Sequence, residues 1–260
     1  MATLAVVMIV KDEAQNLAAC LDTVRWADEI VVLDSGSSDD TLAIARRYTD
    51  KVFQEGDWQG YGIQRQRAQR HARSDWILMV DADERVTSKL RGSIEQVVAK
   101  DDRTQVYALP RLSWCFGRFI RHGGWYPDYV TRLYPREQAA YGDQRVHEKL
   151  SHEGLTVARL QGDLLHYTYR DLHHYLVKSA GYARDWAAAR HGRDKRATLS
   201  QGIGHALGCF LRMYLLRGGF LDGRAGLLLA LVSAHSTFVK YAALWLHRQP
   251  VAAEYRNEGH

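Results

Sequence analysis

Three apolar runs of strand length, separated by segments of helical spacing, constrain the fold of this chain more than any other feature. The runs are Leu4–Val10, Glu29–Leu33 and Trp76–Val80. Between the first two, apolar residues recur at helical spacing from Leu17 to Val24. Strands that alternate with helices in this way are typical of a parallel sheet covered by helices. We therefore predict an α/β fold for the first part of the chain.

Weaker signals complete the predicted order of elements in this part. They are a turn at Ser35–Thr41 leading into a helix that ends at Tyr48, a strand near Val52-Phe53, a basic helix over Gln64–Ala72, a helix over about Ser88–Lys100 and a strand over Gln105–Pro110.

The second part of the chain has a different pattern. Residues 110–146 hold three of the four prolines and many aromatic residues, which favours extended segments and loops. Two β-like stretches follow at Val146–Leu150 and Leu164–Thr168, and from Asp171 the pattern is helical to about residue 248. We therefore predict one domain over residues 1–170 and a helical extension over residues 171–260.

The motif Asp81-Ala82-Asp83 directly follows the Trp76–Val80 run. Ligands of open α/β sheets bind at the carboxyl ends of the strands, and residues one apart in an extended backbone point to the same side. A cation offsets the repulsion of two such carboxylates, and their oxygens suit Mg²⁺ or Mn²⁺, which commonly also bind substrate phosphates. The motif indicates a metal–diphosphate site, although such pairs also arise by chance. Glu84 is expected to point away, as a solvated partner of Arg85.

Composition narrows the class of partner. The net charge of +5 and the pI near 9.1 favour an anionic partner, which could be a nucleotide, a nucleic acid or an acidic lipid surface. A nucleic acid is disfavoured because the arginines are dispersed and the aromatics form no stacking platform. The three cysteines are widely spaced and fit reduced thiols. Met1–Val10 lacks a basic start and a cleavage site, which favours a first buried strand over a signal peptide.

Three residues near the predicted sheet edge are candidates for binding a nucleotide. Asp34 ends the second strand and could accept hydrogen bonds from a base or a ribose, or it could simply form the turn before Gly36. The loop after it has neither a dinucleotide-binding nor a P-loop glycine pattern. Glu13, taken alone, is better explained as a first-turn helix residue that complements the helix dipole. Arg65 could reach a diphosphate, whereas the other arginines of its helix fit a solvated face.

Two later residues are candidates for catalysis and metal binding. Glu148 lies among basic residues, which keep a carboxylate ionised and able to take a proton from an attacking hydroxyl. The alternative is a surface ion pair. His166 follows Leu164-Leu165, and its imidazole could be a metal ligand or a buried structural histidine.

Taken together, these segments resemble the family 2 glycosyltransferases of the GT-A type. The matching segments are VVMIVKDEAQNL, EIVVLDSGSSDDT, WILMVDADE, RVHEKL and LLHYT, over roughly residues 4–168. A closer likeness is to bacterial lipopolysaccharide core β-1,4-glucosyltransferases, which add glucose to the first inner-core heptose. It is carried by WYPDYVTRLYPR, VHEKL, HYTYRDLHHYLVKSAGYA and GGFLDGRAGLLLA.

The resemblance implies a GT-A, Rossmann-like, mostly parallel sheet and an inverting transfer of glucose from UDP-glucose to a heptose of the lipopolysaccharide inner core. It implies that Glu148 is the catalytic base and that Asp83 and His166 hold a divalent Mg²⁺ or Mn²⁺. The nucleotide-sugar site would consist of Val10, Glu13, Asp34, Arg65, Asp81 and Ala82. One departure is that the base is commonly in a Glu-Asp pair, whereas His147-Glu148 stands here.

The helical extension combines basic and apolar residues. A cluster of five basic residues (Arg184, Arg190, Arg193, Lys195 and Arg196) precedes the apolar runs Leu207–Leu216 and Leu227–Val232. We expect amphipathic helices in a membrane interface, with arginines drawn to anionic lipid, on the cytoplasmic face of the inner membrane. The alternative is that these helices pack against protein, and the oligomeric state is left open.

Two other functions are compatible with these residues. One is the same fold acting on another polysaccharide or lipid-linked acceptor. The other is a nucleotide-binding membrane protein without catalytic activity, which the intact set of Asp81, Asp83, Glu148 and His166 disfavours.

Overall fold

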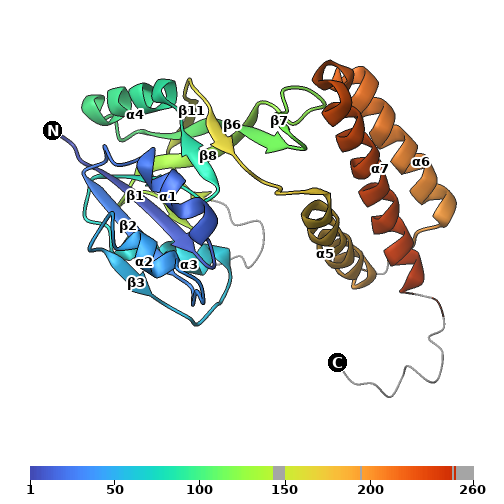
Figure 1. Cartoon of the computed structure of the whole chain (residues 1–260), viewed down its shortest axis with the longest axis horizontal. Coiled ribbons are helices and arrows are strands. Elements are labelled where there is room, and N and C mark those ends of the chain that lie inside the picture. Colours follow the sequence, from blue (N-terminus) through green and yellow to red (C-terminus); the bar gives the residue numbers. More distant parts are fainter. Residues whose placement is uncertain (143–149, 194, 248, 250–260) are drawn as a thin grey trace. The chain divides into compact units, whose positions relative to one another are not determined.

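The computed structural model describes residues 1–142, 150–193, 195–247 and 249, and it divides into two compact units (Figure 1). Unit 1 consists of Met1–Ser113 and Pro127–Tyr167. Unit 2 consists of Trp114–Tyr126 together with the chain from Thr168 onward. The predicted division after residue 170 did not include the segment Trp114–Tyr126, which belongs to the helical unit.

Unit 1 is built on a mixed, mostly parallel sheet. The strand order is β3 (Val52–Gln54), β2 (Glu29–Asp34), β1 (Leu4–Val10), β4 (Trp76–Met79), β8 (Asp128–Pro135), β6 (Gln105–Cys115), β12 (Leu164–His166) and β5 (Glu84–Val86). The first four strands are parallel, and β8 is antiparallel to both of its neighbours. Beyond it, β12 is parallel to β6, as is β11 (Thr156–Arg159), and β5 is antiparallel to β12.

Helices cover both faces of this sheet. One apolar core contains residues of α1 (Ala14–Asp22), α2 (Thr41–Ala45) and α4 (Ser88–Lys100), and the other contains residues of α3 (Tyr61–Arg70). Along β1, Leu4, Val6, Met8 and Val10 enter the first core, whereas Ala5 and Val7 enter the second. A strand buried on both faces has no polar face, which explains its continuous apolar sequence.

Some boundaries differ from those predicted. The helix after the Asp34 loop ends at Ala45 rather than Tyr48. The strand predicted over Gln105–Pro110 continues to Cys115, because its later residues pair with β12. Of the predicted Val146–Leu150 stretch, only Leu150 is described, and it belongs to β10 (Leu150–Ser151), which pairs with β9 (Ala140–Tyr141).

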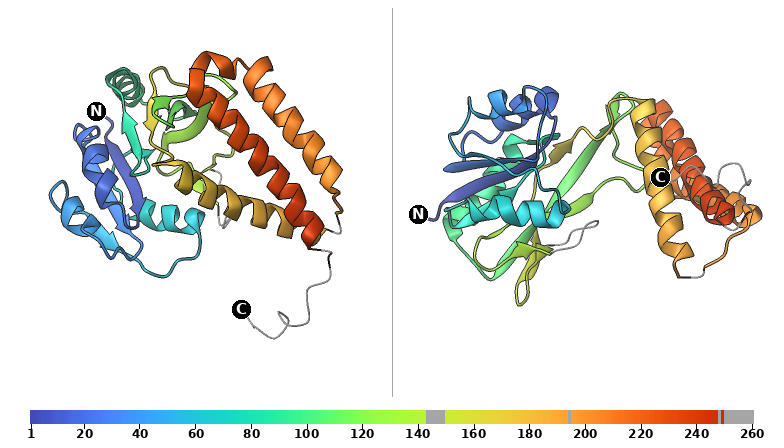
Figure 2. Two further views of the ribbon diagram at one scale, coloured as in Figure 1. Left: turned by 45° about the vertical axis from the view of Figure 1, so that its right-hand side comes forward. Right: turned by 90° about the horizontal axis from the view of Figure 1, so that it is seen from below.

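Unit 2 is helical, as predicted for the residues after Asp171. Its helices are α5 (Leu172–His191), α6 (Leu199–Leu211) and α7 (Gly223–Leu246), and α6 and α7 lie side by side (Figure 2). The side chains of Asp171 and Thr198 cap α5 and α6. Two short turns, η1 (Arg212–Leu216) and η2 (Gly219–Asp222), join α6 to α7.

A small apolar core holds unit 2 together. It contains Cys115 and Ile120 from the segment around β7 (Arg118–Phe119), Tyr175 from α5, and Ala225 and Leu229 from α7. The last residues of β6 therefore continue into the helical unit, where β7 pairs with them in antiparallel fashion.

Candidate active site

The carboxyl ends of β1, β2 and β4 meet at one edge of the sheet. Val10 pairs with Asp34 in the β1–β2 register, and the carbonyl of Val10 accepts a hydrogen bond from Ser35 N at 2.8 Å. In the neighbouring strand, Val80 N donates to the carbonyl of Val7, and the Asp81-Ala82-Asp83 motif follows directly. The fold thus brings the predicted nucleotide-sugar residues of three separate strands to one rim, as the parallel arrangement requires.

The side chain of Asp34 forms hydrogen bonds within the loop that follows β2. It is 0% exposed and accepts hydrogen bonds from Gly36 N and Ser37 N, each at 3.0 Å, and from the Ser37 hydroxyl. Gly36 has φ of +92°, a conformation that a glycine adopts without strain. These contacts agree with the alternative role that the sequence allowed for Asp34, which is to form the turn before Gly36. A contact between Asp34 and a nucleotide stays a prediction.

The loops that follow β1 and β2 are hydrogen-bonded to each other. Glu13 N donates to the Thr41 hydroxyl at 2.8 Å, and Asp12 accepts from Ser38 N at 2.7 Å. The Glu13 carboxylate accepts from Asn16 of α1 at 2.8 Å, as a residue at the start of a helix can. Glu13 therefore lies at the rim, in a loop that its neighbours hold in place.

Two arginines hold the carboxylate of Asp81. Arg65 of α3 donates to Oδ1 at 2.7 Å, and Arg132 of β8 donates to Oδ2 at 2.5 Å. Both arginines are buried. Burial alone would raise the pKa of Asp81, but the charges of Arg132 and Arg65 outweigh it and hold that pKa below its usual range. Asp81 is therefore ionised and fixed in orientation.

The prediction for Glu84 is wrong. Its side chain is 0% exposed rather than solvated, and one oxygen accepts a hydrogen bond from Asp81 N at 2.9 Å. The other oxygen lies 3.7 Å from Arg111 Nη1 and 3.9 Å from Arg132 Nη2. Burial, together with the charge of Asp81, raises the pKa of Glu84. The turn between β4 and β5 reverses the direction of the chain, which is why Glu84 faces inward instead of alternating outward.

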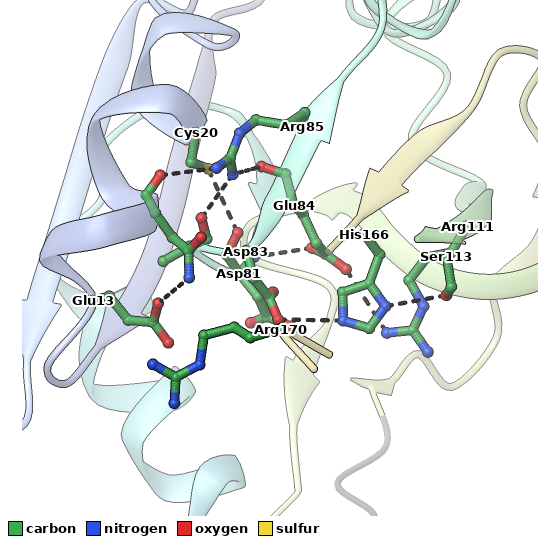
Figure 3. Close-up of polar contacts among 12 residues, drawn as sticks. Glu13, Cys20, Asp81, Asp83, Glu84, Arg85, Arg111, Ser113, His166 and Arg170 are labelled. Carbon is green, nitrogen blue, oxygen red and sulfur yellow. Dashed lines mark hydrogen bonds and ion pairs between the residues drawn. The ribbon is translucent and has the colours of Figure 1, made fainter. Parts of the chain in front are cut away.

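Asp83 and His166 form the pair that could hold a metal ion. Asp83 Oδ2 lies 3.3 Å from His166 Nε2, and His166 Nδ1 lies 3.3 Å from the Ser113 hydroxyl (Figure 3). Sheet pairing explains the approach, because His166 of β12 is the register partner of both Glu84 in β5 and Ser113 in β6. Residues 83 apart in the sequence are thereby placed next to each other.

The chemistry of this pair fits a divalent ion that is shared with a substrate. A carboxylate oxygen and an imidazole nitrogen are suitable ligands for Mn²⁺, and a carboxylate oxygen also suits Mg²⁺. Within the described ranges of the chain, no group of three or more His, Cys, Asp or Glu side chains is arranged to hold a metal. An ion held by Asp83 and His166 would therefore keep most of its coordination positions for water and substrate oxygens.

The predicted catalytic base, Glu148, lies outside the described residues, so its assignment stays a prediction. The described strand before it, β9, ends at Tyr141, whose ring lies 5.3 Å from Cζ of Arg65. Tyr141 is thus in contact with one of the two arginines that hold Asp81.

Sequence reasoning missed Arg132, Arg111 and Ser113. Arg132 directly precedes Leu133 and Tyr134 in the buried half of its strand, and a charged residue in such a place is a signal for a buried ion pair. For Ser113 there was no comparable signal, because its contact with His166 depends on the register of β6 and β12.

Comparison with known proteins identifies the family. A family model described as glycosyl transferase family 2 matches residues 5–152. The lipopolysaccharide core biosynthesis glycosyltransferase LpsC of Rhizobium meliloti (strain 1021) is 28% identical over 248 residues, which cover 92% of this chain and 90% of that protein. An uncharacterized glycosyltransferase of Rickettsia felis is 25% identical over 248 residues, which cover 91% of this chain and 87% of that protein.

A solved structure has the same fold. The mannosyltransferase PcManGT from Pyrobaculum calidifontis, in complex with GDP-Man and Mn²⁺, matches 98% of this chain and 78% of that chain with a TM-score of 0.51 and 14% identity. The predicted GT-A fold, with its mixed and mostly parallel sheet and flanking helices, is confirmed, as are the C-terminal helices. The chain belongs to glycosyl transferase family 2 and is a glycosyltransferase.

Proposed function

We propose that this glycosyltransferase moves glucose from UDP-glucose onto a heptose of the lipopolysaccharide inner core, with inversion at the anomeric carbon. The observation that carries the chemistry is the Asp83–His166 pair at the rim of the sheet, beside the ionised Asp81. The acceptor is supported by the similarity to LpsC, a lipopolysaccharide core glycosyltransferase, over most of both chains.

In this proposal Asp83 and His166 hold a divalent Mg²⁺ or Mn²⁺ ion. Such an ion, when bound, neutralises the charge that develops on the departing diphosphate. The nucleotide lies along the carboxyl ends of β1 and β2, where Val10, Glu13 and Asp34 are placed. Arg65 and Arg132 keep Asp81 ionised and oriented, so that Asp81 and Ala82 face the sugar-diphosphate from a fixed position.

Glu148 takes the proton of the acceptor hydroxyl as that oxygen attacks the anomeric carbon of the sugar. The bond between the acceptor oxygen and the anomeric carbon forms as the bond from that carbon to the phosphate oxygen breaks, and UDP leaves. Attack opposite to the leaving group inverts the configuration. Base catalysis of this kind typically contributes ~10²–10⁴-fold to a rate.

We further propose that the enzyme works at the cytoplasmic face of the inner membrane, where a lipid-linked acceptor is accessible. The segment Gly219–Leu246 is long and apolar enough to cross a membrane, and only 22% of its most apolar window is buried. The cluster of five basic residues lies in α5 and in the segment between α5 and α6. Attachment to the surface through unit 2 accounts for both features.

A donor and acceptor screen tests the proposal. Purified protein is incubated with UDP-glucose, UDP-galactose or GDP-mannose and with lipopolysaccharide cores that end at the inner-core heptose, with and without EDTA. We expect transfer from UDP-glucose only, loss of transfer in EDTA, and a β-linked product by NMR. Transfer to a different acceptor would replace the heptose assignment, and release of no UDP with any acceptor would favour a non-catalytic nucleotide-binding protein.

A further inference from the structure

The turn that joins α6 to α7 exposes several large apolar side chains. Five large apolar side chains there are each at least 40% exposed, and Leu216 is the most exposed at 82%; they are Leu211, Leu215, Leu216, Phe220 and Leu221. We call these five residues the apolar tip. They lie on the end of α6 and on the turns η1 and η2, at one end of the helical hairpin, where they continue a row of exposed apolar side chains of α6 that includes Ile203 and Leu207.

A cavity of about 440 Å³ lies in unit 2, lined in part by η1, the turn that also carries Leu215 and Leu216 of the tip. Its walls come from η1 and the residue after it, which supply Arg212 and Arg217, and from α6, where Gly204 and Gly208 leave open space. The segment before β8 contributes Gly123–Trp125. We call it the Arg212–Arg217 cavity.

The cavity is cationic. No carboxylate is among the residues that line it, and within the part of the chain that the structure describes no carboxylate pairs with Arg212 or Arg217. The nearest acidic residue in the sequence is Asp222, which is 1% exposed and accepts hydrogen bonds from Arg121 N at 3.1 Å and from His122 N at 2.8 Å. Asp222 also lies 3.7 Å from Nη2 of Arg118 and 3.2 Å from Nδ1 of His122, so its carboxylate is engaged by the segment that contains β7.

The backbone at Gly123 and Gly124 lies next to Arg217. Gly123 N donates to the carbonyl of Arg217 at 2.8 Å, and Gly124 has φ of +83°. A Cβ atom on Gly124 would lie 2.2 Å from Nη1 of Arg217, so a larger residue there would displace the guanidinium. The guanidinium therefore lies close to the main chain at Gly124 and at the wall of the cavity, while Arg217 as a whole is exposed to solvent.

We propose that the Arg212–Arg217 cavity binds the phosphate of a membrane phospholipid headgroup while the apolar tip enters the acyl region. The proposal rests on the membrane attachment proposed above and gives it a specific site. Arg212 and Leu216 belong to the same five-residue turn, so a phosphate ligand and an apolar phase would meet the protein at one place. A bilayer surface is where phosphate and acyl chains meet in this way, and arginine side chains reach its phosphates from apolar neighbours.

Vesicle sedimentation with full-length variants tests the cavity. The double variant Arg212→Gln, Arg217→Gln is compared with Arg224→Gln, because Arg224 is exposed on the first turn of α7 but does not line the cavity. On vesicles that contain phosphatidylglycerol, every lost arginine should weaken binding about fivefold through the surface potential alone. Phosphatidylcholine vesicles carry the phosphate without that potential, so they isolate the contact with the headgroup.

On phosphatidylcholine vesicles we expect the double variant to bind about tenfold more weakly than wild type, since a charge-assisted hydrogen bond is lost, and Arg224→Gln to bind as wild type does. Equal binding by the two variants on these vesicles would overturn the cavity as a phosphate site. Transfer of sugar to a soluble, delipidated core fragment is measured in parallel and should be unchanged, so that failure of the lipid site is distinguished from failure of the proposed transferase activity.

A second pair of variants tests the apolar tip. Leu216→Ser removes an exposed side chain from the tip, and Leu246→Ser removes a 58% exposed leucine from the other end of α7. We expect at least tenfold weaker binding for Leu216→Ser, because an apolar side chain that would be buried among acyl chains is lost, and no change for Leu246→Ser. Equal losses would mean that the helices lie flat on the membrane, and a stable dimer that binds no vesicles would mean that the tip is a protein interface. Either result would overturn the proposal.

Discussion

Arg132 and Arg65 each hold a different oxygen of Asp81, at 2.5 Å to Oδ2 and 2.7 Å to Oδ1. The two acidic residues of the Asp81-Ala82-Asp83 motif are therefore not equivalent. The carboxylate of Asp81 accepts hydrogen bonds from two buried guanidinium groups, whereas that of Asp83 lies next to the imidazole of His166. We infer that Asp83 is the metal ligand and that Asp81 orients the sugar-diphosphate.

Replacement of Arg132 tests this division. We expect Arg132→Met to lower kcat/KM for transfer by about 100-fold, because Asp81 loses a charge-assisted hydrogen bond worth roughly 1.5–3 kcal/mol and is free to rotate. Arg132→Lys keeps the charge and should retain more activity than Arg132→Met. Thermal unfolding of both variants provides the control for folding, and activity of Arg132→Met within threefold of wild type would contradict the role of Arg132.

Removal of a metal ligand should abolish metal-dependent binding of the donor. We expect Asp83→Asn to lose the gain in UDP affinity that Mn²⁺ confers on wild type, and His166→Gln to retain part of it. Isothermal titration with UDP, with Mn²⁺ or with EDTA, measures this gain without any need for turnover. As a matched control, Asp128→Asn removes a partly exposed carboxylate that pairs with Arg111 at 2.6 Å and should leave the gain unchanged. An undiminished effect of Mn²⁺ in Asp83→Asn would place the ion elsewhere.

Replacement of the predicted base should separate catalysis from binding. We expect Glu148→Gln to lower transfer by ~10²–10⁴-fold while the affinity for UDP-glucose stays near that of wild type, since the base acts on the acceptor hydroxyl. The neighbouring variant His147→Gln is the control and should transfer normally. If Glu148→Gln turned over at a near-normal rate, the base would have to be another residue.

Glu29 makes the stability of unit 1 depend on pH. Burial alone would raise its pKa, but hydrogen bonds from Lys51, Arg73 N and Ser74 lower it from 4.5 to about 2. A depressed pKa contributes stability that is fully present above pH 4.5 and is lost as the pH falls toward 2. We expect Glu29→Gln to unfold with a free energy roughly 2–3 kcal/mol smaller than that of wild type at pH 7, and with a shrinking difference below pH 4.5.

Urea titrations at pH 7, 5 and 3 measure this difference. Glu95→Gln provides the control, because Glu95 forms an exposed ion pair with Arg91 and should change the free energy of unfolding by less than about 1 kcal/mol at every pH. A constant difference between wild type and Glu29→Gln over this range would mean that ionisation of Glu29 is not the source of its effect.

The sequence predicted the sheet well where local signals are strong. The runs at β1, β2 and β4 are continuous because both faces of each strand are buried, and a continuous apolar run that alternates with helices is hard to misread. The acidic motif could be placed at the sheet edge for the same reason, since it directly follows one of these strands.

Contacts set by register and by buried charge could not be predicted. Glu84 was expected in solvent, but the turn after β4 places it in the interior between Arg111 and Arg132. Arg65 was singled out as the arginine of its helix that could reach a diphosphate, and only the packing of α3 shows that its guanidinium is buried against Asp81. The hairpin Trp114–Tyr126 was grouped with the first domain because chain order says nothing about which core its apolar residues enter.

The pairing of β12 with β5 has a consequence for the timing of maturation. Asp83 is synthesised early, but its partner His166 leaves the ribosome only after most of the sheet has been translated. A nascent or prematurely terminated chain that already exposes the acidic motif would lack the imidazole that completes the pair. In the proposed mechanism both residues hold the ion, so full affinity for it would arise late in biogenesis, and fragments that end before β12 should not compete with the finished enzyme for manganese.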